Sequence, residues 1–152
     1  MNHAQLKKRV AITPPAAIID NASATTATID TLGFDYAEVV VHFGAMDIAV
    51  TAMKMQESDD SGMSGAADVT GLVFGTSTNT AGSTSTLPSA TDDNKFFSFF
   101  IDLRGRKRYL DLVLTLGDGA AGTYVTAFVE LWRGENQPCT ATARGNSQEL
   151  LV

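Results

Sequence analysis

The chain has 152 residues with a formal net charge of −6, and 18% of its residues are charged. This length predicts one domain that can bury a core without cross-links. The single cysteine, Cys139, excludes an intrachain disulfide and a Cys-rich zinc site. The negative charge argues against direct nucleic-acid binding, since such proteins usually carry a basic face. The sequence contains no run of 18 apolar residues, so no membrane-spanning helix is predicted.

The N-terminal residues 1–15 are polar and basic, with Lys7, Lys8 and Arg9 in one cluster and prolines at 14 and 15. The prolines interrupt the apolar segment, so a signal peptide is not expected. We expect an N-terminal arm, either mobile or ordered on a partner. At the other end, residues 135–152 are polar until the final apolar residues. They predict a C-terminal tail after a domain spanning residues 16–134.

Short β-compatible segments are expected at residues 16–20 and 28–32. The first confident strand covers residues 36–43, where Val39, Val41 and Phe43 share one face. A second strand is expected at residues 48–57, with Met53 and Met55 on one face. The four residues between them, 44–47, predict a hairpin.

Residues 58–93 are rich in Ser, Thr, Gly and Ala, with almost no large apolar side chains. Such a long connection predicts a functional loop or a partly disordered region. Leu72, Val73 and Phe74 are the exception and predict one short strand.

Residues 95–132 predict three consecutive strands joined by two turns. Apolar residues alternate in each of them, and the clearest case is the leucine series at 110, 112, 114 and 116. The glycines at 117, 119 and 122 supply the positive φ angles that a connecting loop needs. With no helical periodicity elsewhere, the pattern predicts an all-β fold, an antiparallel β-sandwich of jelly-roll-like type with extended terminal arms.

No arrangement of residues predicts catalysis, a metal site or a cofactor site. Of the two histidines, His3 lies in the arm and His42 lies on a strand, where a packed or surface position is expected. Two acidic clusters lie beside strands: Glu57, Asp59 and Asp60, and then Asp92 and Asp93. We interpret them as solvated loop acids. A calcium site and a carboxylate pair for glycoside hydrolysis are the alternatives.

A basic cluster interrupts this acidic chain at a predicted turn around Gly105. It consists of Arg104, Arg106, Lys107 and Arg108, and it should project from one rim. It is either a solvated turn or a contact with an acidic partner, and the acidic remainder of the chain favours a protein over nucleic acid. With the arm cluster it gives the candidate contact residues Lys7, Lys8, Arg9, Arg104, Arg106, Lys107 and Arg108.

Two parts of the chain, about 28–60 and 88–134, carry a resemblance. They contain TIDTLGFDYAEVVVHFGAMD, KMQESDD and SATDDNKFFSFFIDLRGRKRYLDLVLTLGDGAAGTYVTAFVELWRG. Together these segments resemble the head decoration, or cement, proteins of tailed bacteriophages. The resemblance implies a jelly-roll-like domain on the outside of the virion capsid, made in the host cytoplasm. It also implies a homotrimer that clamps neighbouring copies of the major capsid protein. It brings no catalytic residues.

The alternative is a β-sandwich module of a phage appendage that binds glycans or host receptors. That function predicts a cleft lined by exposed Trp or Tyr, for which only Trp132, Tyr36, Tyr109 and Tyr124 are available.

Overall fold

A computed structural model describes residues 6–136 and 140–150, and these residues form strands and no helix. A four-stranded sheet has the order β1-β9-β4-β7, and a five-stranded sheet has the order β2-β8-β5-β6, with β3 also paired to β8. Every pairing is antiparallel. The strands are β1 (Lys7–Thr13), β2 (Ala22–Ser23), β3 (Ile29–Asp30), β4 (Tyr36–Phe43), β5 (Ala52–Ser58), β6 (Ala67–Val73), β7 (Phe96–Asp102), β8 (Tyr109–Leu116) and β9 (Val125–Trp132). The predicted antiparallel β-sandwich is confirmed.

One hydrophobic core lies between the two sheets. The four alternating leucines of β8 are at most 1% exposed. Their partners in the core come from β4, β5 and β9, including Val39, Met53, Met55 and Val129. The predicted inward faces of β4, β8 and β9 are therefore confirmed. Side chains at every second position of a strand point to the same face of the sheet. Apolar residues at every second position therefore identify the buried face.

The predicted hairpin between residues 36–43 and 48–57 is wrong. β4 belongs to the four-stranded sheet and β5 to the other, so the segment between them crosses the sandwich. This segment is longer than expected, because β5 begins at Ala52, and it is fixed by a hydrogen bond from Val50 N to Pro88 O. Each of the two strands has one strongly apolar face, and the crossing lets these faces meet through the core.

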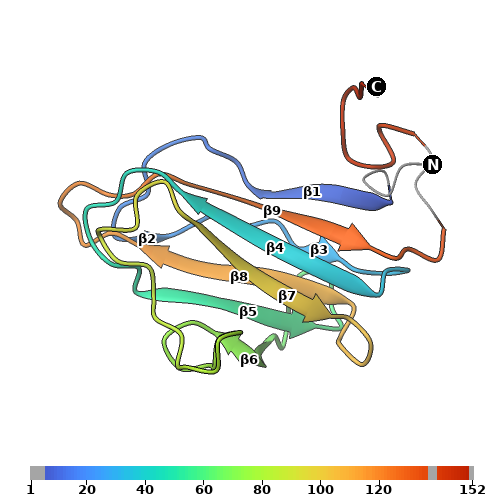
Figure 1. The fold of residues 1–152 in the computed structure, drawn as a ribbon, viewed down its shortest axis with the longest axis horizontal. Helices are drawn as coiled ribbons and strands as arrows, with labels where there is room; N and C mark the ends of the chain where they lie inside the picture. The colour runs from blue at the N-terminus through green and yellow to red at the C-terminus, as the bar shows by residue number, and fades with distance from the viewer. Residues whose placement is uncertain (1–5, 137–139, 151–152) are drawn as a thin grey trace.

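The turns within residues 95–132 also cross between the sheets. β7 and β9 lie in the four-stranded sheet, but β8 lies in the other, so none of these three pairs with the next. In Figure 1 the long strands run along the domain and their connections gather at its two ends. The 103–108 connection lies at the right-hand end, and the 117–124 connection lies at the left-hand end.

The region of residues 58–93 is more ordered than its composition suggests. The strand predicted around Leu72 is part of β6, which pairs with β5. Beyond β6, Asn79 and Ser83 form a polar turn with several hydrogen bonds, and Ser85 N donates to Ser77 O. Short polar side chains hydrogen-bond readily to nearby backbone, so this composition also suits fixed turns.

Residues 7–13, expected in an N-terminal arm that is either mobile or ordered on a partner, form β1 at the edge of the four-stranded sheet. The sequence does not show the alternation of apolar and polar residues expected of a strand, because β1 begins with Lys7, Lys8 and Arg9. Charged residues of this kind are common on edge strands. The tail packs beside this strand, since Arg9 N donates a hydrogen bond to Arg144 O at 2.9 Å. The first five residues of the predicted arm and residues 137–139, which include Cys139, lie outside the described residues.

Candidate interaction surface

A row of paired residues crosses all four strands of the first sheet, at the strand ends that lie on the right in Figure 1. Lys7 of β1 pairs in register with Trp132 of β9. Trp132 pairs with Tyr36 of β4, and Tyr36 pairs with Asp102 of β7. We call these four residues, together with Arg104 and Arg133, the aromatic row.

Cationic groups lie over both aromatic rings of this row. Lys7 Nζ is 5.0 Å from the centroid of a Trp132 ring. The guanidinium carbons of Arg104 and Arg133 lie 5.4 and 5.6 Å from the Tyr36 ring centroid. These distances are within the range of cation–π attraction. Arg104 and Arg133 are at the same time largely exposed to solvent.

Arg104 is also held by a forked pair with Asp102. Its Nε and a terminal nitrogen donate to the two carboxylate oxygens at 2.9 and 2.6 Å. These hydrogen bonds lower the pKa of Asp102 to about 2. The planar fork fixes the guanidinium group in one orientation, which reduces the entropy lost when it meets another surface.

The other cations of the predicted basic cluster lie on the same rim, and each has an acidic partner. Arg106 lies 3.5 Å from Glu57, Lys107 lies 3.7 Å from Asp59, and Arg108 lies 2.7 Å from Asp30. Arg108 also lies over the Tyr109 ring. The structure thus brings the four cations together as predicted, but the rim carries mixed charge. It is not a purely basic patch.

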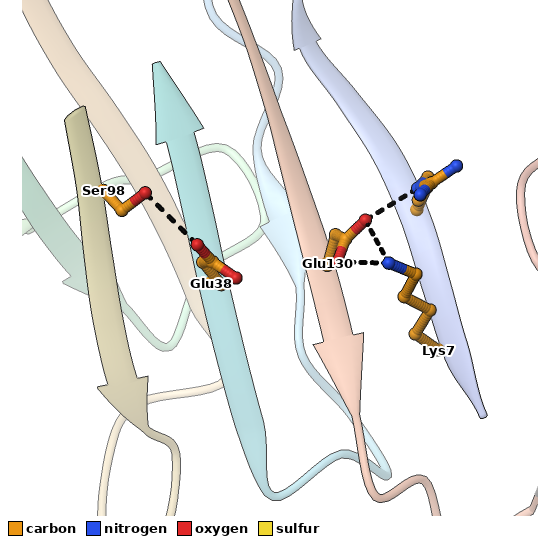
Figure 2. A network of polar contacts seen from close by, with 5 residues as sticks. Lys7, Glu38, Ser98 and Glu130 are labelled. Carbon is orange, nitrogen blue, oxygen red and sulfur yellow. Dashed lines mark hydrogen bonds and ion pairs between the residues drawn. The ribbon is translucent and has the colours of Figure 1, made fainter. Parts of the chain in front are cut away.

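Two of the N-terminal candidates serve the sheet itself. Lys7 Nζ donates to both carboxylate oxygens of Glu130 at 2.7 Å, and Arg9 Nε donates to one of them at 2.7 Å. Figure 2 shows Lys7 and Glu130 pointing toward each other from neighbouring strands. On the next strand, Glu38 accepts a hydrogen bond from the Ser98 hydroxyl group. The Lys8 side chain lies on the opposite face of β1, because successive side chains of a strand point to opposite faces.

The charge of Lys8 instead acts on the rim. The pKa of Asp30 is lowered chiefly by its hydrogen bond from Arg108, and the nearby Lys8 charge adds to this effect. Among the seven predicted contact residues, Lys7 and Arg9 join on Glu130. Lys7 also belongs to the aromatic row, so it lies on the same rim as the four cations of the basic cluster.

Glu130 is mostly buried, with opposing influences on its pKa. Burial raises it, because the charged form loses water, but the hydrogen bonds and charges of Lys7 and Arg9 outweigh burial and the net pKa is lowered. Glu38 is directly opposite Glu130 in the β4–β9 register. The two cations balance the charge of Glu130 on the side away from Glu38.

The predicted acidic clusters have structural partners. Glu57 and Asp59 bind the cations of the rim, and Asp60 accepts backbone N–H groups of its own turn. Asp92 pairs with Lys95 at 2.7 Å, and Asp93 accepts the Met46 N–H. These acids were expected to be solvated loop acids, but Glu57 lies in β5 and the side chains of Glu57 and Asp92 are only 17% and 20% exposed. His42 stacks on Phe96 with ring centroids 4.3 Å apart, which is the packed position expected for it.

A different acidic group lies at the opposite end of the domain. The carboxylates of Asp20, Asp47 and Asp118 lie within 4.8 Å of one another. Carboxylate oxygens are calcium ligands. Here each carboxylate also accepts a backbone N–H from residues 119–121. These hydrogen bonds tie the three groups to the connection from β8 to β9, while Asp47 Oδ1 is buried without a hydrogen-bond partner among the described residues.

Sequence reasoning missed Tyr36, Trp132 and Arg133 as members of the rim surface. The available signal was that Tyr36 begins a strand and Trp132 ends one, each on the outward-facing parity. Their meeting depends on the register of β4 with β9, which no short-range pattern reveals.

None of the described residues forms a helix long and apolar enough to cross a membrane. No family model matches the chain, and no curated protein is significantly similar to it.

Proposed function

We propose that this chain is a structural virion protein, a decoration protein that binds the outside of a tailed-phage capsid. In this role it contacts the major capsid protein and stabilises neighbouring capsid subunits, with a trimer as the favoured assembly and no catalytic activity. The observation that carries the proposal is the aromatic row, where Lys7, Arg104 and Arg133 lie on Trp132 and Tyr36 at one rim.

The residue types of the row support a protein-binding role. Trp, Tyr and Arg are the residues most often found at the energetic centre of protein interfaces. At this rim they are held by ion pairs such as Arg104–Asp102 before any partner arrives. A surface prepared in this way loses little conformational entropy on binding. Its mixed charges also favour a partner with a matching pattern of charge over a uniformly charged polymer.

The winding of the chain supports the jelly-roll part of the proposal. The long strands alternate between the sheets along the second half of the chain, and the sheet orders are β1-β9-β4-β7 and β2-β8-β5-β6. These orders fit two interlocked Greek keys, the arrangement of a jelly roll in many capsid proteins. The segments that resemble decoration proteins supply β3, β4, β5, β7, β8 and β9.

Binding to capsids tests the proposal. Expanded capsids of the phage that carries this gene, lacking the chain, are mixed with purified protein and sedimented. We expect the wild type to co-sediment at saturable stoichiometry. The double change Arg104→Ala and Arg133→Ala should reduce affinity at least about tenfold, since it removes two interface side chains. Lys95→Ala is the matched control, because it removes an exposed paired cation at the other end of β7. Absence of wild-type binding would refute the capsid function.

The glycan-binding alternative retains one supporting observation. A groove of about 540 Å³ is lined by phenylalanines of β7 and by Ser77, Thr78 and Asn79. Rings beside short polar side chains can bind sugars, although no Trp or Tyr lines this groove. Specific hits on a glycan array, with no binding to capsids, would favour this alternative.

A further inference from the structure

The four-stranded sheet has two edges that differ in their protection. At one edge, β1 is joined by the tail through Arg9 N and Arg144 O. At the other edge, β7 pairs only with β4 among the described residues. An open strand edge presents unpaired backbone groups and readily pairs with another strand. The β7 edge is therefore the exposed one.

The register identifies which backbone groups of β7 are free. Leu103 N donates to Asp35 O, and Phe43 N donates to Lys95 O. In an antiparallel ladder, hydrogen-bonded pairs alternate with non-bonded pairs. The odd-numbered residues of β7 therefore bond to β4. The N–H and C=O groups of Phe96, Ser98 and Phe100 point away from the sheet.

The side chains at this edge are as unusual as the backbone. Phe96 and Phe100 are each 65% exposed, although they lie on a regular strand. Beside them runs the 540 Å³ groove, whose other wall is formed by residues 71–80 and Ser85. Phe74 packs edge-on against Phe97 and Phe99 and forms part of the groove. A long edge strand with exposed large apolar residues is a surface for strand pairing.

We propose that the β7 edge pairs with the β7 edge of a second copy of this chain, antiparallel and around a twofold axis at Ser98. The sequence of the strand reads the same in both directions around this residue: Phe96, Phe97, Ser98, Phe99, Phe100. In this register Ser98 is opposite Ser98, and Phe96 is opposite Phe100 of the second copy. The free backbone groups of all three positions bond across the axis, and the phenylalanines form cross-strand aromatic pairs.

The other phenylalanines of the strand are paired in the same register. Phe97 comes opposite Phe99 of the second copy. A twofold axis repeats each of these contacts, as an isologous interface requires. The small Ser98 side chain at the axis allows the two backbones to approach closely. The palindromic apolar pattern thus selects one occupant, the chain itself.

This contact stands apart from the proposed capsid function. It joins two copies and uses the β7 edge, whereas the aromatic row lies at the strand ends. If a threefold contact also forms, the free protein assembles into a hexamer; otherwise it is a dimer. In either case the number of copies is even.

Sedimentation equilibrium tests this assembly. We expect the wild type to have an even number of copies and Phe100→Lys to halve the mass. Leu32→Lys is the matched control, because Leu32 is also 65% exposed but lies in the β3–β4 connection. Its mass should equal that of the wild type. A monomeric or trimeric wild type would overturn the proposal and leave the β7 edge for another partner.

Cysteine cross-linking tests the register. In a Cys139→Ser background, Ser98→Cys should form an intermolecular disulfide under mild oxidation, since hydrogen-bonded antiparallel partners have Cα atoms about 5.5 Å apart. Phe100→Cys alone should not cross-link, because its equivalents lie about 13 Å apart in this register. A mixture of Phe96→Cys and Phe100→Cys chains should cross-link. If Phe100→Cys cross-links and Ser98→Cys does not, the proposed twofold register is wrong.

Discussion

Lys7 and Glu130 form an ion pair in which the lysine Nζ lies 2.7 Å from both carboxylate oxygens. The pair joins the first strand of the chain to the last. It is only slightly exposed, with side-chain exposures of 19% and 10%, so solvent screens it less than the rim pairs.

Removal of the Glu130 carboxylate should destabilise the protein. Glu130→Ala leaves two cations, Lys7 and Arg9, without their shared partner. We expect the free energy of unfolding to fall by about 1–2 kcal/mol, less than for a fully buried pair. Chemical denaturation measures this change. Asp68→Asn is the control, because it weakens a more exposed pair with Lys54 and should cost clearly less stability. Equal effects of the two changes would contradict the role assigned to Glu130.

Stability should depend on pH through the carboxylates with lowered pKa values. The pKa values of Asp92, Asp102 and Glu149 are about 2, and that of Glu130 is lowered. Between these values and the ordinary values of 3.8 for Asp and 4.5 for Glu, the unfolded chain binds more protons. Stability from these groups is therefore complete above pH 4.5 and is lost as pH falls toward 2.

Denaturation midpoints across the acid range measure this dependence. Glu130→Gln should flatten the slope below pH 4.5, because its titrating group is removed. A slope that is unchanged in this variant would show that Glu130 has the same pKa in the folded and unfolded states.

The leucine face of β8 should be the most sensitive part of the core. Leu112 is 1% exposed and belongs to the central cluster. Leu112→Ala should cost about 3 kcal/mol, from lost burial and the cavity left behind. Leu112→Asp should abolish folding, because it buries an unpaired charge. Calorimetry checks both, with the exposed Leu32→Ala as a control that should change stability by less than about 0.5 kcal/mol.

Gly145 should control the docking of the tail. It has a φ of +78°, and a Cβ atom there would collide with the carbonyl oxygen of Arg9. Gly145→Ala should release residues 140–150 and make them sensitive to proteases. Gly105→Ala is the control, since Gly105 has a φ of +81° but open space around its Cβ position. That change should cost about 1 kcal/mol of backbone strain and leave tail cleavage unchanged. Equal cleavage of the two variants would contradict the docking contact.

The fold class and the inward faces could be predicted because they depend on local alternation. The series Leu110 to Leu116 and Val39 to Phe43 each identify a buried face from spacing alone. Strand neighbours could not be predicted in this way. The pattern of β4 fits a hairpin with β5 as well as a crossing, and only the competition among all strands for the core decides between them.

Only part of the candidate surface could be predicted, because only part of it is formed by residues that are close in the sequence. Arg104, Arg106, Lys107 and Arg108 share one short connection, so their proximity follows from the sequence. Asp102 is two residues from Arg104, but the acidic partners of the other three cations and the rings of the aromatic row come from distant segments. Lys7 and Arg9 appeared free in sequence because Glu130 is more than 120 residues away.

Thermal rupture of capsids tests the capsid function most directly. Capsids of the tailed phage proposed as the source of this chain are heated with and without the purified chain, and release of the packaged DNA is followed by a fluorescent dye. We predict that saturating wild-type protein raises the rupture temperature. The Arg104→Ala and Arg133→Ala double variant should need higher concentrations to give the same shift. An unchanged rupture temperature at saturating wild-type protein would contradict the proposed clamping role.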